Sequence, residues 1–394
     1  MTQGISEVLA PLVLPPVLFE ERATQNGKRI GIATLNSEKT LHAISLEMVD
    51  LLDPQLRKWA SDPQIAVVVI QAAGEKAFCA GGDLQHLYRT MLEHHASDDP
   101  ENIQGNTYAG AFFEREYRLD YLIHTFPKPI LAWGHGIVMG GGIGLMAGAS
   151  HRVVTEKSRL AMPEITIGLY PDVGGTWFLN RMPGQVGLFL ALTGASIGAA
   201  DAIFAKLADY HIAQANKQAV LDALLTQPWS GHDDDVLLTR LLQRSAISAE
   251  DAALASAPLW QNFALINQLC SEPTLAEIVD AIVTLNTDDV WLQKAIATLV
   301  AGSPGSACLS YALQRRTQHL SLAEIFRLEY VVSLHCAARA DFSEGVRALI
   351  IDKDRQPKWL HATLESVASD WIDGFFIGPW SGEKRAAHPL ADLN

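Results

Sequence analysis

The sequence predicts an α/β core followed by a helical C-terminal region, and two observations support this. Between residues 30 and 213, short runs of β-branched residues alternate with amphipathic stretches of helical period, the pattern of βαβ units. After residue 216 the apolar residues recur at helical spacing, and no strand-like run separates them. We therefore predict an N-terminal arm at 1–27, an α/β core at 28–215 and a helical region at 216–394.

Within the core, the predicted strands are 30–35, 65–71, 129–136, 151–156, 160–163 and 208–213, and helices are predicted at 44–60 and 107–125. In the C-terminal region the predicted helices are 217–227, 234–244, 248–257, 275–285, 290–300, 306–316 and 322–339. No repeat period relates these helices, so we do not expect a solenoid.

Composition and charge exclude several classes of function. The chain has 394 residues, 48% of them hydrophobic and 19% charged, which is typical of a globular protein with large cores. Its net charge of −14 argues against nucleic acid or an anionic membrane as a partner, because both require a basic surface. The apolar window at 129–151 contains seven glycines, so we do not expect it to span a membrane.

The four cysteines are far apart and form no C-x-x-C motif, which predicts neither a disulfide framework nor a metal site. We expect reduced thiols in a cytoplasmic protein. The N-terminal stretch has no basic segment before its apolar residues, so we expect neither a signal peptide nor a transit peptide.

Two glycine-rich loops each follow a predicted strand and precede a predicted helix. The first, KAFCAGGD at 76–83, contains Gly81 and Gly82, and Asp83 is placed to cap a helix that begins at Leu84. The second contains the glycine triplet 140–142. The first N–H groups of a helix have no intrahelical acceptor, so the two loops can direct two amides at one carbonyl oxygen. Such a pair would form an oxyanion hole.

Two carboxylates follow the triplet. Glu164 has apolar neighbours, and we expect its partly desolvated carboxyl to have a raised pKa suited to a general base. Asp172 precedes a predicted helix, so the residues taken alone favour an N-capping role. Glu116, taken alone, is a solvated surface charge. We interpret His135 as a core or interface histidine, and Cys79 as a small buried residue rather than a nucleophile.

The segments KAFCAGGD, KPILAWGHGIVMGGGIGL and MPEITIGLYPDVGGTWFL, in this order, resemble the crotonase (enoyl-CoA hydratase/isomerase) superfamily. The resemblance covers about residues 28–215 and implies a spiral of ββα units. It implies that the amides of Gly82 and Gly141 hold a thioester oxygen. It also assigns substrate contacts to Glu116, Glu164 and Asp172, and further to Ala80, Asp83, Leu84 and Gly141.

Two departures from the hydratase pattern restrict the resemblance to one branch of the superfamily. Hydratases of the superfamily have a glutamate where this chain has Gly144, and a glycine where it has Asp172. The pair Glu164 and Asp172 instead resembles the 3-hydroxyisobutyryl-CoA hydrolase branch, as do the segments 112–123 and 329–359. A G-x-G-x-x-A match at 142–147 is displaced from its strand, so we reject a dinucleotide site there.

The resemblance implies hydrolysis of a short 3-hydroxyacyl-CoA ester, namely 3-hydroxyisobutyryl-CoA in valine catabolism. Coenzyme A is then part of the substrate, no cofactor or metal is needed, and a homo-oligomer is compatible with the superfamily. Glu164 would act as general base towards water or attack the carbonyl to give an anhydride. Two alternatives stay open: isomerase or hydratase activity on the same fold, and a non-catalytic acyl-CoA-binding module.

Overall fold

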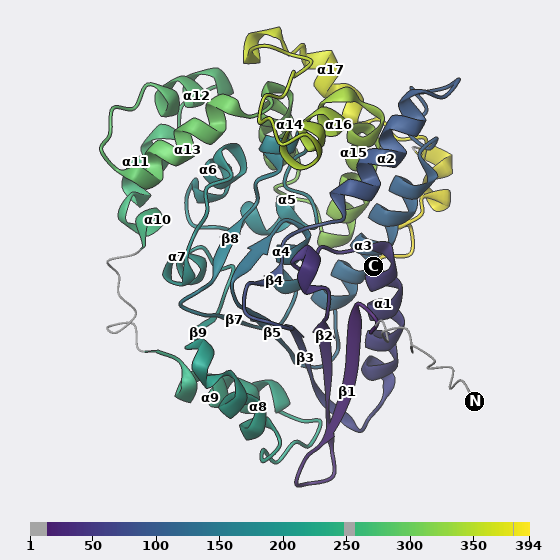
Figure 1. Ribbon diagram of the computed structural model, residues 1–394, viewed down its shortest axis with the longest axis vertical. Coiled ribbons are helices and arrows are strands. Elements are labelled where there is room, and N and C mark those ends of the chain that lie inside the picture. Colours follow the sequence, from purple (N-terminus) through teal and green to yellow (C-terminus); the bar gives the residue numbers. More distant parts are fainter. Residues whose placement is uncertain (1–13, 248–256, 381) are drawn as a thin grey trace, which may run out of the picture.

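The computed structural model describes residues 14–247, 257–380 and 382–394 (Figure 1). Nine strands form two sheets in these residues. The larger sheet has the order β1 (Val17–Ala23), β2 (Arg29–Leu35), β3 (Ile65–Ala72), β5 (Ile130–Gly134), β7 (His151–Val154) and β9 (Tyr210–His211). The smaller sheet has the order β4 (Ala77–Cys79), β6 (Ile137–Met139) and β8 (Arg159–Ala161).

The two sheets are built by a repeated unit. Each of three successive strand pairs, β3 with β4, β5 with β6 and β7 with β8, gives its first strand to the large sheet and its second to the small one. Every pairing within these sheets is parallel except that of β1 with β2. A helix or 3-10 turn follows each pair, so the predicted spiral of ββα units is confirmed.

Strand β3 shows why the sequence forms this sheet. Its residues IAVVVIQA are buried except for the partly exposed Gln71, as expected for a central strand covered on both faces. The predicted N-terminal arm contains a strand that we did not predict. In β1, Val17 pairs with Leu35 and Ala23 with Arg29, and its mixed sequence VLFEERA lacks a clean apolar alternation.

The helices of the core are α1 (Leu46–Ser61), α2 (Leu84–His95), α3 (Thr107–His124), α4 (Gly141–Ala147), α5 (Gly175–Leu179), α6 (Val186–Thr193) and α7 (Ala199–Phe204). The C-terminal region contains α8 (Lys217–Leu224), α9 (Asp234–Ser245), α10 (Pro258–Gln261), α11 (Phe263–Leu269), α12 (Leu275–Val283), α13 (Val290–Ala301), α14 (Pro304–Arg316), α15 (Leu322–Ala338), α16 (Ala340–Val346) and α17 (Ser369–Asp373). The predicted helix 248–257 falls almost wholly outside the described residues.

The C-terminal helices cover the core beside the glycine loops. Helix α15 packs against α3, and α16 packs against α2 and the 3-10 turn η2 (Glu164–Ile167). In Figure 1 these helices lie together on one side of the molecule. By length and hydropathy, no individual helix among the described residues could span a bilayer, although α13 and α14 taken together, with a 106° bend, meet that test.

Candidate active site

A small cavity of about 80 Å³ lies where the two glycine loops meet. Its walls combine both loops, the segment from Pro163 to Val173, and the helices α2, α3 and α16. Of the residues predicted for the site, Ala80, Gly82, Leu84, Glu116, Gly141, Glu164 and Asp172 line this cavity. The remaining wall is largely apolar and includes Leu87, Phe112, Phe113 and Phe342.

Asp83 is the predicted site residue that does not line the cavity. Its carboxylate accepts a hydrogen bond of 3.2 Å from the amide of His86 and so caps α2. The capping prediction is therefore confirmed, but the predicted substrate contact has no support in the geometry. A side chain already used to satisfy the first turn of α2 faces the helix rather than the cavity.

The amides of Gly82 and Gly141 come together from the two loops. Ile44 donates to the carbonyl of Gly81 (2.8 Å) and accepts from the amide of Asp83 (2.9 Å), so the intervening Gly82 N–H faces away from this bridge. Gly141 is the first residue of α4. Neither amide has an acceptor within the described residues. A Cβ placed on Gly141 would lie 3.7 Å from the Gly82 nitrogen, so both donors border one space.

Backbone conformation explains why glycine is required here. Gly81 has φ of 110° and Gly140 has φ of 50°, values that residues with a side chain rarely adopt. Gly142 has a different role: a Cβ there would lie 2.4 Å from the carbonyl oxygen of Cys79. Because glycine has no Cβ, α4 can pack closely against β4.

Glu164 is the first residue of η2 and is only 4% exposed. Its Oε1 lies 3.0 Å from the position of a Cβ on Gly140, and its Oε2 has no hydrogen-bond partner within the described residues. Burial, and then the nearby charge of Asp172, raise its pKa well above the usual range of glutamate. Glu164 thus has one carboxyl oxygen without a partner beside two unpaired amides, which suits a base or a nucleophile.

Asp172 and Glu116 are also buried. Asp172 accepts a hydrogen bond of 2.7 Å from the hydroxyl of Tyr117. Burial raises the pKa of Asp172 to about 6, while the Tyr117 bond acts in the opposite direction. The N-capping alternative for Asp172 is wrong, because Gly174 is the N-cap residue of α5.

The surface-charge interpretation of Glu116 is also wrong, because the Glu116 side chain is buried and only 2% exposed. Burial, and then the charge of Asp172, raise the pKa of Glu116 well above the usual range of glutamate.

Asp120 is a fourth carboxylate that we did not predict. It lies one turn after Glu116 on α3, fully buried, and neither of its oxygens has a partner within the described residues. A Cβ on Gly144 would lie 3.0 Å from Asp120 Oδ2 and 2.8 Å from Val173 Cβ. Position 144 therefore has no room for a glutamate. In the sequence, the i,i+4 spacing of Glu116 and Asp120 places both carboxylates on one face of a helix, and this was the available indication of Asp120 as a further carboxylate of the site.

A hydrogen-bonded network lies behind Asp172. The hydroxyl of Tyr117 is 2.7 Å from Ser333 Oγ, which is 2.9 Å from the hydroxyl of Tyr170. Tyr170 donates to the carbonyl of Glu329 (2.8 Å). The Glu329 carboxylate accepts from the amides of Gly174 (2.8 Å) and Thr176 (3.1 Å). Helix α15 thus supports the segment that carries Asp172.

Other candidate residues have structural roles. His135 is buried and its Nε2 is 3.1 Å from the carbonyl of Gly74, which confirms a core histidine. Burial raises the pKa of the Cys79 thiol to about 12, so Cys79 is no nucleophile.

Two basic residues that flank the sequence motifs are bound within the protein. Arg118 binds Asp392 and Glu114, and Lys128 donates to the carbonyls of Trp59 and Asp62. In the part of the chain that the structure describes, no cluster of three His, Cys, Asp or Glu side chains could hold a metal.

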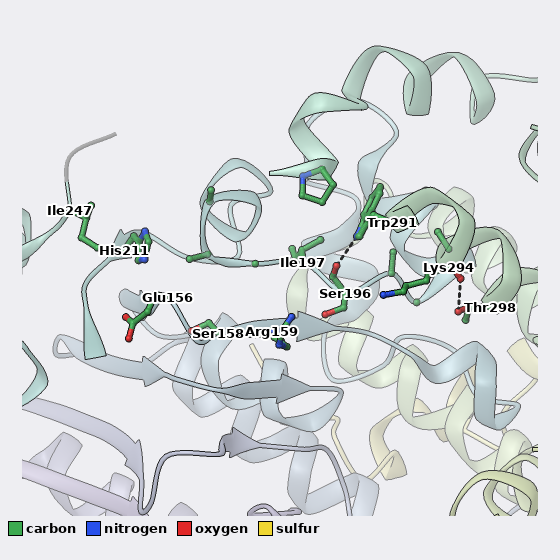
Figure 2. A pocket seen from close by; sticks show the side chains of 17 residues that line it. Glu156, Ser158, Arg159, Ser196, Ile197, His211, Ile247, Trp291, Lys294 and Thr298 are labelled. Atoms are coloured by element: carbon green, nitrogen blue, oxygen red, sulfur yellow. Dashed lines mark hydrogen bonds between the residues drawn. The ribbon is translucent and has the colours of Figure 1, made fainter. Parts of the chain in front are cut away.

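A larger cavity of about 780 Å³ lies between β8, α7 and α13 (Figure 2). Arg159, Ser196, His211 and Lys294 line it, and Trp291 donates to the carbonyl of Ser196 at 2.7 Å. None of the glycine-loop residues or the buried carboxylates borders this cavity. The smaller cavity is the candidate active site, because the two unpaired amides and the buried carboxylates of Glu116, Glu164 and Asp172 meet there.

Comparison with known proteins agrees with this geometry. Residues 30–376 match the family model described as enoyl-CoA hydratase/isomerase. The chain is 39% identical to the zebrafish (Danio rerio) protein named "3-hydroxyisobutyryl-CoA hydrolase, mitochondrial", covering 91% of this chain and 89% of that protein. The human protein of the same name is 36% identical, with coverages of 88% and 86%.

Two solved structures are similar over nearly the whole chain. An enoyl-CoA hydratase from Rhodobacter sphaeroides has a TM-score of 0.77 and 34% identity, covering 92% of this chain and 98% of that one. A carnitinyl-CoA dehydratase from Mycobacterium thermoresistibile has a TM-score of 0.78 and 30% identity, with coverages of 92% and 96%. The chain therefore belongs to the enoyl-CoA hydratase/isomerase family, in the branch whose curated members are named 3-hydroxyisobutyryl-CoA hydrolase.

Proposed function

We propose that the protein hydrolyses 3-hydroxyisobutyryl-CoA to 3-hydroxyisobutyrate and coenzyme A, a step of valine catabolism. The observation that carries this proposal is the buried carboxyl of Glu164, whose Oε2 has no partner within the described residues, beside the unpaired amides of Gly82 and Gly141. The names of the vertebrate relatives support the choice of reaction and substrate. No cofactor is required, because coenzyme A is part of the substrate.

In this mechanism the thioester oxygen accepts hydrogen bonds from Gly82 and Gly141. Each donor of such a pair stabilises the transition state by about 3 kcal/mol. Glu164 takes a proton from water as the hydroxide attacks the carbonyl carbon, and the resulting tetrahedral oxyanion is held by the two amides. The C–S bond then breaks, and the proton returns from Glu164 to the departing thiolate.

A covalent route uses the same residues. The Glu164 carboxylate attacks the carbonyl carbon, the thiolate departs with a proton from the solvent, and water then hydrolyses the anhydride. Under single-turnover conditions in ¹⁸O-labelled water, label in the Glu164 carboxyl identifies the covalent route. In the covalent route ¹⁸O enters the Glu164 carboxyl when water attacks the enzyme side of the anhydride, and in the general-base route it enters only the product.

We assign the 3-hydroxyl group of the substrate to Asp172 and Glu116, since both line the cavity and both pKa values are raised by burial. A protonated carboxyl can donate to the hydroxyl oxygen, and an ionised one can accept from its proton. Position 144 argues against hydration of a 2-enoyl ester. Asp120 and Val173 leave no room there for the second glutamate that hydratases of the superfamily use.

We assign the reaction to a compartment that keeps thiols reduced, because all four cysteines are free. The cytoplasm predicted from the sequence and the mitochondrion named for the vertebrate relatives both meet this condition, and cell fractionation distinguishes them. The homo-oligomer also stays a prediction, to be tested by light scattering.

The reaction is tested by thiol release from a panel of coenzyme A esters. We expect 3-hydroxyisobutyryl-CoA, and to a lesser degree 3-hydroxypropionyl-CoA, to release free coenzyme A faster than saturated or 2-enoyl esters do. Loss of the 2-enoyl absorbance without thiol release would instead identify a hydratase. Binding of the esters with no chemical change would identify an acyl-CoA-binding module.

A further inference from the structure

Three buried hydroxyl groups connect Asp172 to the backbone of α15. The hydroxyl of Tyr117 lies 2.7 Å from Asp172 Oδ2 and 2.7 Å from Ser333 Oγ. Ser333 Oγ lies 2.9 Å from the hydroxyl of Tyr170, which lies 2.8 Å from the carbonyl oxygen of Glu329. We call the hydroxyls of Tyr117, Ser333 and Tyr170 the hydroxyl chain. Their side chains are buried, so the four contacts are shielded from bulk water.

The number of hydrogen atoms available to these contacts depends on Asp172. Each of the four contacts needs one hydrogen between its two oxygen atoms. The three hydroxyls supply three, and the carbonyl of Glu329 supplies none, because a carbonyl oxygen only accepts. Within the described residues, the hydroxyl chain has no further hydrogen-bond partner. The fourth hydrogen therefore comes from the carboxyl of Asp172, and only when this carboxyl is protonated.

The two protonation states of Asp172 give the hydroxyl chain different arrangements. When the carboxyl is protonated, every bond of the chain points away from Asp172 and each contact has its hydrogen. When the carboxyl is ionised, Tyr117 donates to Asp172 instead, and Ser333 can donate to only one of the two tyrosine hydroxyls. The other contact of Ser333 then brings two oxygen atoms to 2.7 or 2.9 Å with no hydrogen between them.

Two opposing effects thus act on the carboxyl of Asp172. The hydrogen bond from Tyr117 stabilises the ionised form and so lowers the pKa of Asp172. The contact that lacks a hydrogen destabilises the same form, because a buried polar group without a partner costs at least as much as a typical hydrogen bond contributes. Ser333 takes part in that contact whichever tyrosine it donates to, so Ser333 is the residue that opposes Tyr117.

The titratable groups that surround Asp172 are all acids. Besides the two tyrosines of the hydroxyl chain, they are Glu116 and Asp120 of α3, Glu164 of η2, and Glu329 and Cys336 of α15. None of these groups is a cation, so the ionised form of Asp172 depends mainly on the hydrogen bond from Tyr117. Helices α3 and α15, which carry Tyr117 and Ser333, pack against each other and fix the spacing of the chain (Figure 1).

We propose that Ser333 is a positioning residue for Asp172: it favours the protonated carboxyl by completing the hydroxyl chain, and it thereby counteracts Tyr117. The carboxyl can then take up and release a proton while the 3-hydroxyl group of the substrate is bound to it. The proposal rests on the proposed hydrolysis, in which Asp172 contacts that hydroxyl group. Tyr170 acts in the same direction as Ser333, because its hydroxyl uses its single hydrogen on the carbonyl of Glu329.

The test is the pH profile of kcat/KM for thiol release from 3-hydroxyisobutyryl-CoA. Ser333→Ala removes the contact that lacks a hydrogen in the ionised state, so the acidic limb should move to lower pH by roughly one unit. Tyr170→Phe should move the limb in the same direction, whereas Tyr117→Phe should move it to higher pH. Ser333→Cys keeps the space filled against water, and it should also lower the limb because a thiol is a weak donor and acceptor.

Ser310→Ala is the matched control. Ser310 is a buried serine of α14 whose hydroxyl has no partner within the described residues, so the limb should stay in place. An acidic limb that stays in place or moves to higher pH in Ser333→Ala would overturn the proposal. A movement in Ser333→Ala that is missing in Ser333→Cys would also overturn it, since entry of water then explains the effect, and so would an equal movement in Ser310→Ala.

Infrared spectra of the ligand-free protein test the hydroxyl chain without turnover. The carbonyl band of a protonated carboxyl disappears on ionisation, and the part of this band that Asp172→Asn removes belongs to Asp172. That part should disappear at lower pH in Ser333→Ala than in the unmodified protein. If no ester releases thiol but the band shifts as expected, the proposed reaction fails and the role of Ser333 stands. If thiol is released but the band does not shift, the role of Ser333 fails and the reaction stands.

Discussion

Replacing Gly141 with alanine tests the oxyanion hole. The new Cβ would lie 2.6 Å from Glu116 Oε1 and 3.0 Å from Ile44 Cδ1, in the space between the amides of Gly141 and Gly82. We expect the methyl group to displace Glu116 and to keep the thioester oxygen from reaching both donors. Loss of one such donor costs about 3–4 kcal/mol, or roughly 10²–10³-fold in kcat.

Thiol release from 3-hydroxyisobutyryl-CoA measures this loss, and thermal unfolding measures any accompanying damage to the fold. Gly198→Ala is the matched control, since a Cβ on Gly198 meets nothing within 4 Å and its φ is −91°. We expect the control to retain the kcat of the unmodified protein. The reasoning is refuted if Gly141→Ala folds normally and its kcat stays within about threefold of that value.

Three further predictions concern the buried groups. Tyr117→Phe removes the hydrogen-bond donor that lowers the pKa of Asp172. We expect kcat/KM to fall about tenfold, and the acidic limb of its steady-state pH profile to move to higher pH. An unmoved limb would show that Tyr117 does not affect the pKa of Asp172. In the unmodified protein kcat/KM should rise with pH through about 6 and above, because burial raises the pKa values of Glu164 and Asp172 and the base must be ionised; a flat profile would contradict this. Burial raises the pKa of Glu329 to about 8 from a usual 4.5, so the folded state binds more protons than the unfolded state between these two pH values. The contribution of Glu329 to the free energy of unfolding therefore falls as the pH rises through this window. Glu329→Gln should flatten that decline in urea titrations at pH 5 and pH 8, and an unchanged decline would show that other groups cause it.

The sequence predicted those parts of the site that depend on local patterns. Each glycine loop follows an apolar strand and opens a helix, so short-range rules were enough to find the two loops, and the family resemblance then singled out Gly82 and Gly141. The apolar neighbours of Glu164 similarly predicted a buried carboxyl, and the structure confirms its burial. The central strand β3 was equally clear, because nearly all of its residues are apolar.

Features that depend on distant contacts were missed or misjudged. Without the family resemblance, Glu116 was interpreted as a surface charge, because nothing in its own segment shows that α15 and the glycine loops enclose it. Ser333 joins Tyr117 and Tyr170 across separations of 216 and 163 residues, beyond the reach of any local pattern. Strand β1 was missed because its pairing with β2, rather than its own composition, defines it.

The central claim is that Glu164 acts directly on a thioester held by two amides. It is tested most directly by thiol release from 3-hydroxyisobutyryl-CoA by Glu164→Gln, with binding of the ester measured separately by calorimetry. We predict that turnover falls by at least about 10³-fold while the ester still binds, because the amide cannot accept the proton of water or attack the carbonyl. Turnover equal to that of the unmodified protein would contradict the mechanism.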